Sequence, residues 1–246
     1  MQHTESFIPE KYRVVSGSAL KLIAMITMVI DHIAVVLLRY NRIVLFRTAT
    51  SAVTLYDVMR TVGRISFPLF AFLLTEGFIH THDRKKYALR LFLFALISEI
   101  PWNLEHTGTL RYGTQNVFFT LLLGFLGLWT IEWFRSAETR RDQWEAALAL
   151  FVLLAVSILL KADYGSTGFA FILMLYLLRE APLGRAALGC CMLSGGWKAG
   201  MAFIPIALYN GKRGFIRGRV AALFFYAFYP LHILILYWIK SRTIGY

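Results

Sequence analysis

Two ionisable residues, Lys21 near the start and His32 well inside, lie in the first long apolar stretch of the chain, ALKLIAMITMVIDHIAVVLL. Ionisable side chains inside a membrane-spanning helix are rare because burying them in lipid is costly. Residues of this kind are therefore candidates for function. As a helix, this stretch would place the two residues roughly 16 Å apart along the axis and on nearly the same face. Met25 and Met28 fall between them. The stripe would suit a long substrate with an anionic head and a reactive tail.

His32 is the strongest candidate for a general base, because imidazole titrates near neutrality and can accept a proton from an attacking group. Asp31 precedes His32 but points about 100° away around the helix. The group that orients the imidazole therefore stays open, with Glu99 and Asp163 as alternatives from other segments. The competing structural interpretation is a snorkelling lysine and a histidine hydrogen-bonded inside the bundle.

Polar residues elsewhere in or beside the apolar segments are further candidates. Those that we predict to contact substrate are Arg64, Glu76, Asn103, Gln115, Asn116, Asp163 and Tyr164. The amide side chains among them could donate hydrogen bonds to a developing oxyanion. The competing interpretation is that they join helices through hydrogen bonds, as single polar residues in membrane bundles often do.

The sequence contains no spacing typical of a metal site or a nucleotide-binding loop. There is no HExxH, CxxC, Walker loop, G-x-S-x-G elbow or dinucleotide fingerprint. We therefore predict no metal. The short loop GKRG at 211–214 lacks the strand and spacing of a P-loop, but its Lys212 and Arg213 could hold phosphate groups.

Composition indicates that the elements carrying these residues cross a membrane. Of the 246 residues, 58% are hydrophobic and 16% are charged, and the mean hydropathy is +0.58. A soluble domain carries more charge, and the apolar runs are continuous rather than alternating, which favours helices over a barrel. The net charge of +12 is attributed to basic cytoplasmic loops rather than to nucleic-acid binding. The adjacent Cys190 and Cys191 are assigned to packing.

Apolar segments are predicted at about 20–38, 63–79, 88–104, 117–134, 144–160, 166–178, 186–196, 199–210 and 219–239. The seventh and eighth are short and separated by Gly195 and Gly196, so a kinked span, a re-entrant pair and two thin crossings all stay open. The distribution of Lys and Arg favours a cytoplasmic N-terminus and a cytoplasmic GKRGFIRGR loop. We expect an all-α polytopic integral membrane protein with about nine (eight to ten) transmembrane helices around an intramembrane polar site. We expect a single domain over residues 1–246.

Several sequence segments together resemble the TraX family of membrane proteins, named for the pilin N-terminal acetylase of conjugative systems. They are LKLIAMITMVIDHIA, VGRISFPLFAFLLTEGFIHT, KYALRLFLFALISEIPWNL, QNVFFTLLLGFLG, ADYGSTG, LYNGKRG and YAFYPLHILILY. The family is similar to the wider transmembrane acyltransferase superfamily. Members of that superfamily carry on the first helix a basic residue and a histidine with ten residues between them, a pattern that Lys21 and His32 match.

The resemblance implies a membrane-bound O- or N-acetyltransferase in the bacterial cytoplasmic membrane, using cytoplasmic acetyl-CoA as co-substrate. His32 would be the catalytic histidine, either as the base that deprotonates the acceptor or as a group that is itself acetylated and passes the acetyl on. Lys21 would contact CoA. Lys212 and Arg213 would form a second clamp for its phosphates, and the pantetheine arm would lie along Met25 and Met28. The acceptor stays open among a peptide N-terminus, a glycan and a lipid.

Two functions of other classes remain as alternatives. A small proton-coupled transporter would use Glu76, Glu99, Asp163 and His32 as a relay. A non-catalytic assembly protein would need none of these residues for chemistry. Tight binding of acetyl-CoA would favour the acetyltransferase, and transmembrane flux of a solute would favour the transporter.

Overall fold

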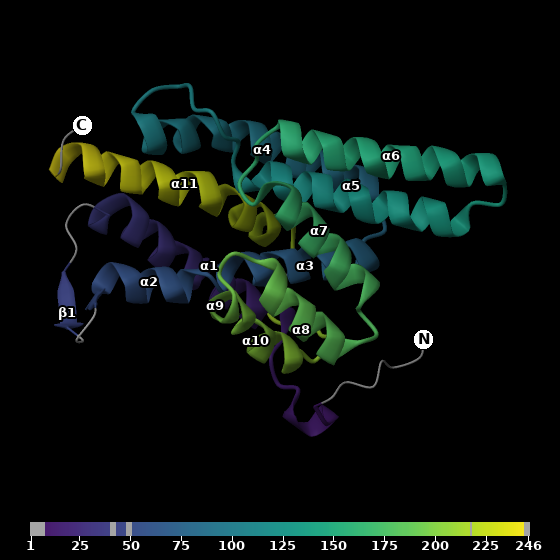
Figure 1. Cartoon of the computed structure of the whole chain (residues 1–246), viewed down its shortest axis with the longest axis horizontal. Coiled ribbons are helices and arrows are strands. Elements are labelled where there is room, and N and C mark those ends of the chain that lie inside the picture. The colour runs from purple at the N-terminus through teal and green to yellow at the C-terminus, as the bar shows by residue number, and fades with distance from the viewer. Residues whose placement is uncertain (1–7, 40–42, 48–50, 217, 244–246) are drawn as a thin grey trace.

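Helices make up most of the described chain, as the continuous apolar runs predict (Figure 1). The computed structural model describes residues 8–39, 43–47, 51–216 and 218–243. The longer helices are α1 (Gly17–Ile33, continued by the π-helical turn η2, Ala34–Leu38), α3 (Ser66–His80), α4 (Arg84–Thr107), α5 (Val117–Ser136), α6 (Arg140–Leu159), α7 (Gly165–Leu177) and α11 (Arg219–Thr243). The shorter elements are η1 (Glu10–Tyr12), β1 (Val44–Arg47), β2 (Ala52–Thr54), α2 (Leu55–Gly63), α8 (Pro182–Met192), α9 (Trp197–Gly200) and α10 (Phe203–Ala207).

Five helical stretches in the described part of the chain are long and apolar enough to cross a membrane. They are Gly17–Leu38, Leu55–His80, Val117–Ser136, Arg140–Leu159 and Leu223–Thr243. The expected nine crossings are therefore not confirmed. α4 has 24 residues, but it carries several charged side chains, and α7 is apolar but has only 13 residues.

Side-chain caps explain where several helices begin. The Ser16, Asp83, Asn116 and Thr139 side chains each accept a hydrogen bond from a backbone N–H in the first turn of α1, α4, α5 and α6. Thr54 and Asp57 form a reciprocal capping box at the start of α2. The all-α expectation needs one correction, because β1 and β2 pair antiparallel before this cap, with Val44 opposite Thr54.

The segment from α8 to α10 folds back on itself. Its helices have 11, 4 and 5 residues, and Gly196 has a φ of 52° where α8 gives way to α9. Beyond α10, the Asn210 N–H donates to the Val15 carbonyl at 2.9 Å, directly before α1. Tyr176 of α7 packs on Phe78 near the C-terminal end of α3, and Tyr209 bonds to Glu76 at that same end. The segment therefore begins and ends on the side of the helix bundle where α3 ends, which fits the re-entrant alternative.

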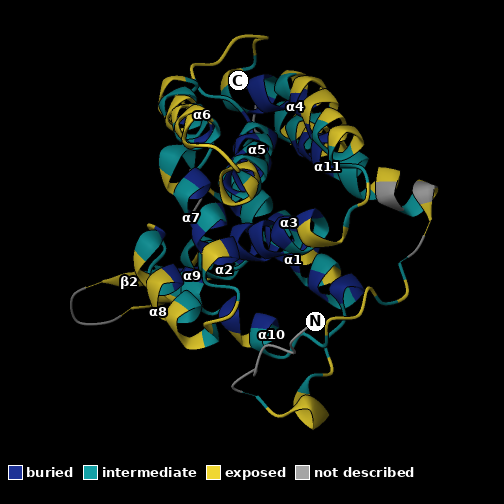
Figure 2. Ribbon diagram, turned by 90° about the vertical axis from the view of Figure 1, so that its right-hand side faces the viewer, coloured by how far each residue is buried: buried dark blue, intermediate teal, exposed yellow. Residues whose placement is uncertain are grey.

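The tightly packed interior lies along α1, α3, α5 and α7 (Figure 2). Gly127 of α5 allows α7 to approach, because a methyl group there would come within 2.9 Å of Phe169. In contrast, α6 buries only Ala146 and Ser157, and most of its ribbon is coloured as exposed or intermediate (Figure 2). An apolar helix with so little buried surface is suited to contact with lipid.

Candidate functional site

One cavity brings together many of the ionisable residues singled out from the sequence. It has a volume of about 620 Å³ and is lined by α1, α3, α4, α5, α11 and the loops beside them. Its lining includes Lys21, His80 and Arg213 toward the N-terminal end of α1, and Asp31, His32 and Asp163 toward the other end. We call these the Lys21 end and the His32 end. Met28 lines the wall between them.

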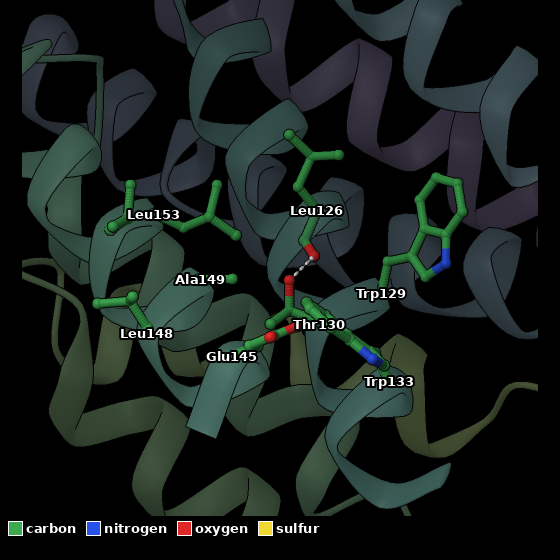
Figure 3. Close-up of a pocket in the computed structure, with 9 residues that line it drawn as sticks. Leu126, Trp129, Thr130, Trp133, Glu145, Leu148, Ala149 and Leu153 are labelled. Carbon is green, nitrogen blue, oxygen red and sulfur yellow. Dashed lines mark hydrogen bonds between the residues drawn. The ribbon is translucent and has the colours of Figure 1, made fainter. Parts of the chain in front are cut away.

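A second pocket of about 620 Å³ lies between α5 and α6 (Figure 3). Leu126, Trp129 and Trp133 of α5 and Leu148 and Leu153 of α6 give it an apolar lining. The Thr130 hydroxyl in this pocket donates to the Leu126 carbonyl at 3.0 Å. The pocket holds none of the predicted site residues, and we interpret it as a lipid-facing groove.

The loop at residues 211–216 is hydrogen-bonded to the first turn of α1. The Gly17 N–H donates to the Lys212 carbonyl at 2.8 Å, and the N–H and hydroxyl of Ser18 donate to the Arg213 carbonyl at 2.9 and 2.8 Å. Gly214 has a φ of 88°, and a methyl group there would meet the Ser18 hydroxyl at 2.7 Å. This attachment puts the Arg213 side chain at the Lys21 end of the cavity.

A third cation lines the same cavity. Arg90 of α4 stacks on Tyr87, with its guanidinium 5.5 Å from the ring centroid, and bonds to the Tyr226 hydroxyl. Lys21 lies over the Phe225 ring at 5.4 Å. Cations from α1, α4 and the 211–216 loop therefore share one cavity with aromatic rings. This combination suits an anionic head group that carries an aromatic base.

The imidazole of His32 is paired with a second imidazole. His32 Nδ1 lies 2.6 Å from Nε2 of His232 on α11, and the two rings are nearly coplanar, with centroids 4.9 Å apart and an angle of 13° between their planes. His232 Nδ1 lies 2.8 Å from the Phe228 carbonyl oxygen. Among the described residues, His232 is therefore the hydrogen-bond partner of the His32 ring, and the expected alternatives Glu99 and Asp163 do not orient it.

Asp31 points away from His32, as the helical geometry predicts. Its carboxylate forms an ion pair with Arg60 of α2. Gly63 makes room for this pair, because a methyl group there would overlap the Asp31 side chain. The second carboxylate oxygen of Asp31 is buried and has no hydrogen-bond partner among the described residues.

Two of the three amides predicted to stabilise an oxyanion make structural contacts through their side chains. Asn116 caps α5, and its amide nitrogen donates to Glu99 and to the Ala95 carbonyl at 2.8 Å. The Asn103 amide donates to the Leu110 carbonyl at 3.1 Å. Through its backbone, Gln115 joins the 161–163 loop. None of the three belongs to the cavity lining.

A different hydroxyl is placed where an oxyanion donor would be useful. Tyr229 lines the cavity, its side chain is buried, and its ring lies edge-on to His32 with centroids 6.1 Å apart. Its hydroxyl oxygen is buried without a hydrogen-bond acceptor for its proton among the described residues. Buried polar groups of this kind require an explanation, and a bound carbonyl oxygen would supply one.

The turn from Ala162 to Gly165 closes the His32 end of the cavity. Tyr164 has a left-handed φ of 65°, and its ring stacks on Phe67 with centroids 3.7 Å apart. The Asp163 N–H donates to the Gln115 carbonyl at 2.8 Å. Burial raises the pKa of the Asp163 carboxyl to about 6, while the nearby His106 imidazole acts in the opposite direction.

Of the remaining predicted residues, some line the cavity and others lie outside it. Glu76 lines the cavity and bonds to Tyr209. Met25 is buried outside the lining, Lys212 has an exposed side chain, and Arg64 lies against Gly195 at the junction of α2 and α3. The described residues contain no group of three His, Cys, Asp or Glu side chains that could hold a metal ion.

Four residues in or beside the site were not predicted from the sequence: Arg60, Arg90, Tyr229 and His232. Arg90 and His232 carried a usable signal, because each is a polar residue inside a predicted apolar segment. Tyr229 carried none, since aromatic residues are abundant throughout the chain.

Sequence comparison relates the chain to known proteins along nearly its whole length. The family model described as TraX protein matches residues 16–240. A probable fimbrial assembly protein FimC, serogroup H1, from Dichelobacter nodosus is 31% identical to this chain in an alignment of 252 positions that covers 90% of this chain and 94% of that protein. No solved structure matches the chain.

Proposed function

Because the chain belongs to the TraX family, we propose that it is a membrane-bound acetyltransferase that uses acetyl-CoA from the cytoplasm. The acceptor is an envelope or exported molecule that carries an amine or a hydroxyl: a peptide N-terminus, a glycan or a lipid. The protein resides in the bacterial cytoplasmic membrane with its N-terminus in the cytoplasm. His32 is the catalytic residue.

The cavity from Lys21 to His32 is the observation that carries this proposal. Lys21, Arg90 and Arg213 line it with cations suited to the phosphates of CoA, and Met28 lies on the way to His32. A slim pantetheine arm fits an apolar passage of this kind. The thioester would then reach a residue able to accept a proton.

In the proposed reaction, His32 removes a proton from the acceptor amine or hydroxyl as the acceptor attacks the thioester carbonyl carbon. The Tyr229 hydroxyl donates a hydrogen bond to the resulting oxyanion. The carbon–sulfur bond then breaks, and the imidazolium returns the proton to the departing CoA thiolate. The products are acetylated acceptor and free CoA.

A non-catalytic role in assembly is the second candidate, because the relative from Dichelobacter nodosus is described as a probable fimbrial assembly protein. A fimbrial subunit could equally be the acceptor of an acetyl group. The two functions differ in one requirement, since only the enzyme needs His32 for chemistry.

Acetyl-CoA binding and envelope acetylation test the proposal together. Purified protein in lipid nanodiscs should bind acetyl-CoA, and mass spectrometry of envelope peptides, glycans and lipids should reveal an acetyl group that depends on the protein. His32→Ala should abolish that acetyl group while a folded protein still binds acetyl-CoA. His82→Ala is the matched control, because His82 is exposed and does not line the cavity. Acetylation that persists in His32→Ala would refute the catalytic role, and solute flux without acetyl-CoA binding would favour the transporter.

A further inference from the structure

The hydrogen bonds around His232 fix which nitrogen carries its proton. Its Nδ1 lies 2.8 Å from the carbonyl oxygen of Phe228, one helical turn earlier on α11. A carbonyl oxygen only accepts, so the His232 Nδ1–H must donate this bond. In neutral His232, Nε2 therefore carries a lone pair and acts as an acceptor.

The same reasoning then assigns the tautomer of His32. Its Nδ1 lies 2.6 Å from His232 Nε2, so the His32 Nδ1–H donates to that lone pair. The proton of neutral His32 is thus held on Nδ1, and its Nε2 keeps the free lone pair that a general base requires. The order along the chain of bonds is His32, His232 and the α11 backbone.

Packing holds this arrangement in place. His232 is 7% exposed, and its ring stacks on Phe228 with centroids 5.1 Å apart and lies nearly coplanar with the His32 ring. Two of the nearby carboxylates have other partners, since Asp31 pairs with Arg60 and Glu99 accepts from Asn116.

We propose that His232 is a positioning residue, which holds the His32 imidazole in the Nδ1–H tautomer with Nε2 free to take a proton from the acceptor. The inference rests on the proposed acetyl transfer for its consequence, but the tautomer itself can be observed without any turnover. In a hydrolase triad an acidic group has the corresponding task of orienting the catalytic imidazole. Here the task belongs to a second histidine anchored to a helix backbone.

Two substitutions separate the hydrogen bond from the packing. His232→Gln keeps a side-chain oxygen that can accept from His32 Nδ1, but it loses the stacked ring. His232→Phe keeps the stacked ring but has no acceptor. If the hydrogen bond matters, His232→Phe should lower kcat for acetyl transfer by about 10-fold to 100-fold with little change in KM for acetyl-CoA, whereas His232→Gln should retain most of kcat. The reverse order of the two variants would mean that His232 only packs, and would overturn the proposal.

Nitrogen NMR of protein labelled with ¹⁵N-histidine gives a readout that does not depend on activity. Comparison with His32→Gln identifies the His32 signals. The wild type should show a protonated Nδ1 and an unprotonated Nε2, and His232→Gln should preserve this pattern. In His232→Phe, the tautomers should mix. A His32 proton on Nε2 in the wild type, or the same Nδ1–H tautomer in His232→Phe, would overturn the inference. Failure to detect acetyl transfer with the expected tautomers present would count against the proposed function alone.

Discussion

The Lys21 end of the cavity gathers cationic side chains from two distant parts of the chain. Lys21 of α1 and Arg213 of the 211–216 loop share the lining although nearly the whole chain separates them. Backbone hydrogen bonds from Gly17 and Ser18 join the two segments, so their backbones are already held together before a ligand arrives. Cations that contact the same part of a ligand throughout the reaction contribute to binding in both the ground state and the transition state.

Lys21→Met should therefore weaken acetyl-CoA affinity by roughly 10-fold or more, because it removes a charged hydrogen-bond donor but keeps an apolar chain over Phe225. Turnover at saturating acetyl-CoA should change much less. Titration of acetyl-CoA at low and high salt measures this, and added salt should weaken the wild type more than the variant. Lys212→Met is the control, since that exposed side chain is outside the lining and its loss should leave affinity close to wild type. Equal affinity of Lys21→Met and the wild type would remove Lys21 from the binding site.

Asp163 gives a prediction about the dependence of stability on pH. Its pKa is about 6 in the folded protein against an ordinary value of 3.8, so the folded state binds more protons than the unfolded state between these values. The contribution of this group to the free energy of unfolding is therefore fully present below about pH 4. It is lost as the pH rises through 6, by on the order of 3 kcal/mol. Relative to the wild type, Asp163→Asn should gain thermal stability as pH increases from about 4 to 7. Parallel melting curves of the two proteins across this range would contradict the assignment.

The residues of the site show what the sequence can and cannot reveal. Lys21 and His32 were predictable because helical spacing relates two positions on one helix. His232 is 200 residues from His32, and nothing local to either residue indicates that they meet. The same holds for the predicted amides, because the cap formed by Asn116 and the loop contact of Asn103 depend on the backbone around them.

The apolar runs predicted the positions of the helices well, but the number of crossings that we expected from them is not confirmed. Each predicted run overlaps a helix, but α8, α9 and α10 are too short to extend across a bilayer and fold back instead. Hydropathy alone cannot distinguish two short crossings from a re-entrant pair, since the distinction depends on tertiary contacts such as that between Val15 and Asn210.

The junction of α2 and α3 provides a test of how elements constrain the site. Gly63 sits against the Asp31–Arg60 ion pair, so Gly63→Ala should push α1 and α2 apart and lower stability by about 1–3 kcal/mol. Gly113→Ala is the matched control, because no atom lies within 4 Å of the added methyl group. Thermal unfolding in detergent measures both changes. Combining Gly63→Ala with Asp31→Ala should cost less than the sum of the single changes. A fully additive double variant would show that the close approach is unimportant.

The two ends of the cavity lie toward opposite ends of the whole molecule, so the proposed function requires one orientation in the membrane. The first turn of α1 and the loop at 211–216 are hydrogen-bonded together, while β1, which pairs with β2, lies beyond the opposite end of α1 (Figure 1). The ends of α4 and α11 meet on that opposite side, where Lys240 donates to the Glu105 carbonyl at 3.1 Å. Acetyl-CoA from the cytoplasm can reach His32 as proposed only if the Lys21 end faces inward.

Cysteine labelling tests that orientation with a pair of exposed positions on opposite sides. In a background with Cys190 and Cys191 replaced by serine, Gly113→Cys in the α4–α5 loop and Lys212→Cys in the loop beside α1 each supply one thiol. Since basic loops favour the cytoplasm, a membrane-impermeant maleimide should label Gly113→Cys in intact cells and Lys212→Cys only after the inner face is opened. Labelling of both positions in intact cells would contradict the arrangement of helices. The reverse pattern would put the Lys21 end outside, away from cytoplasmic acetyl-CoA, and would refute the proposed direction of transfer.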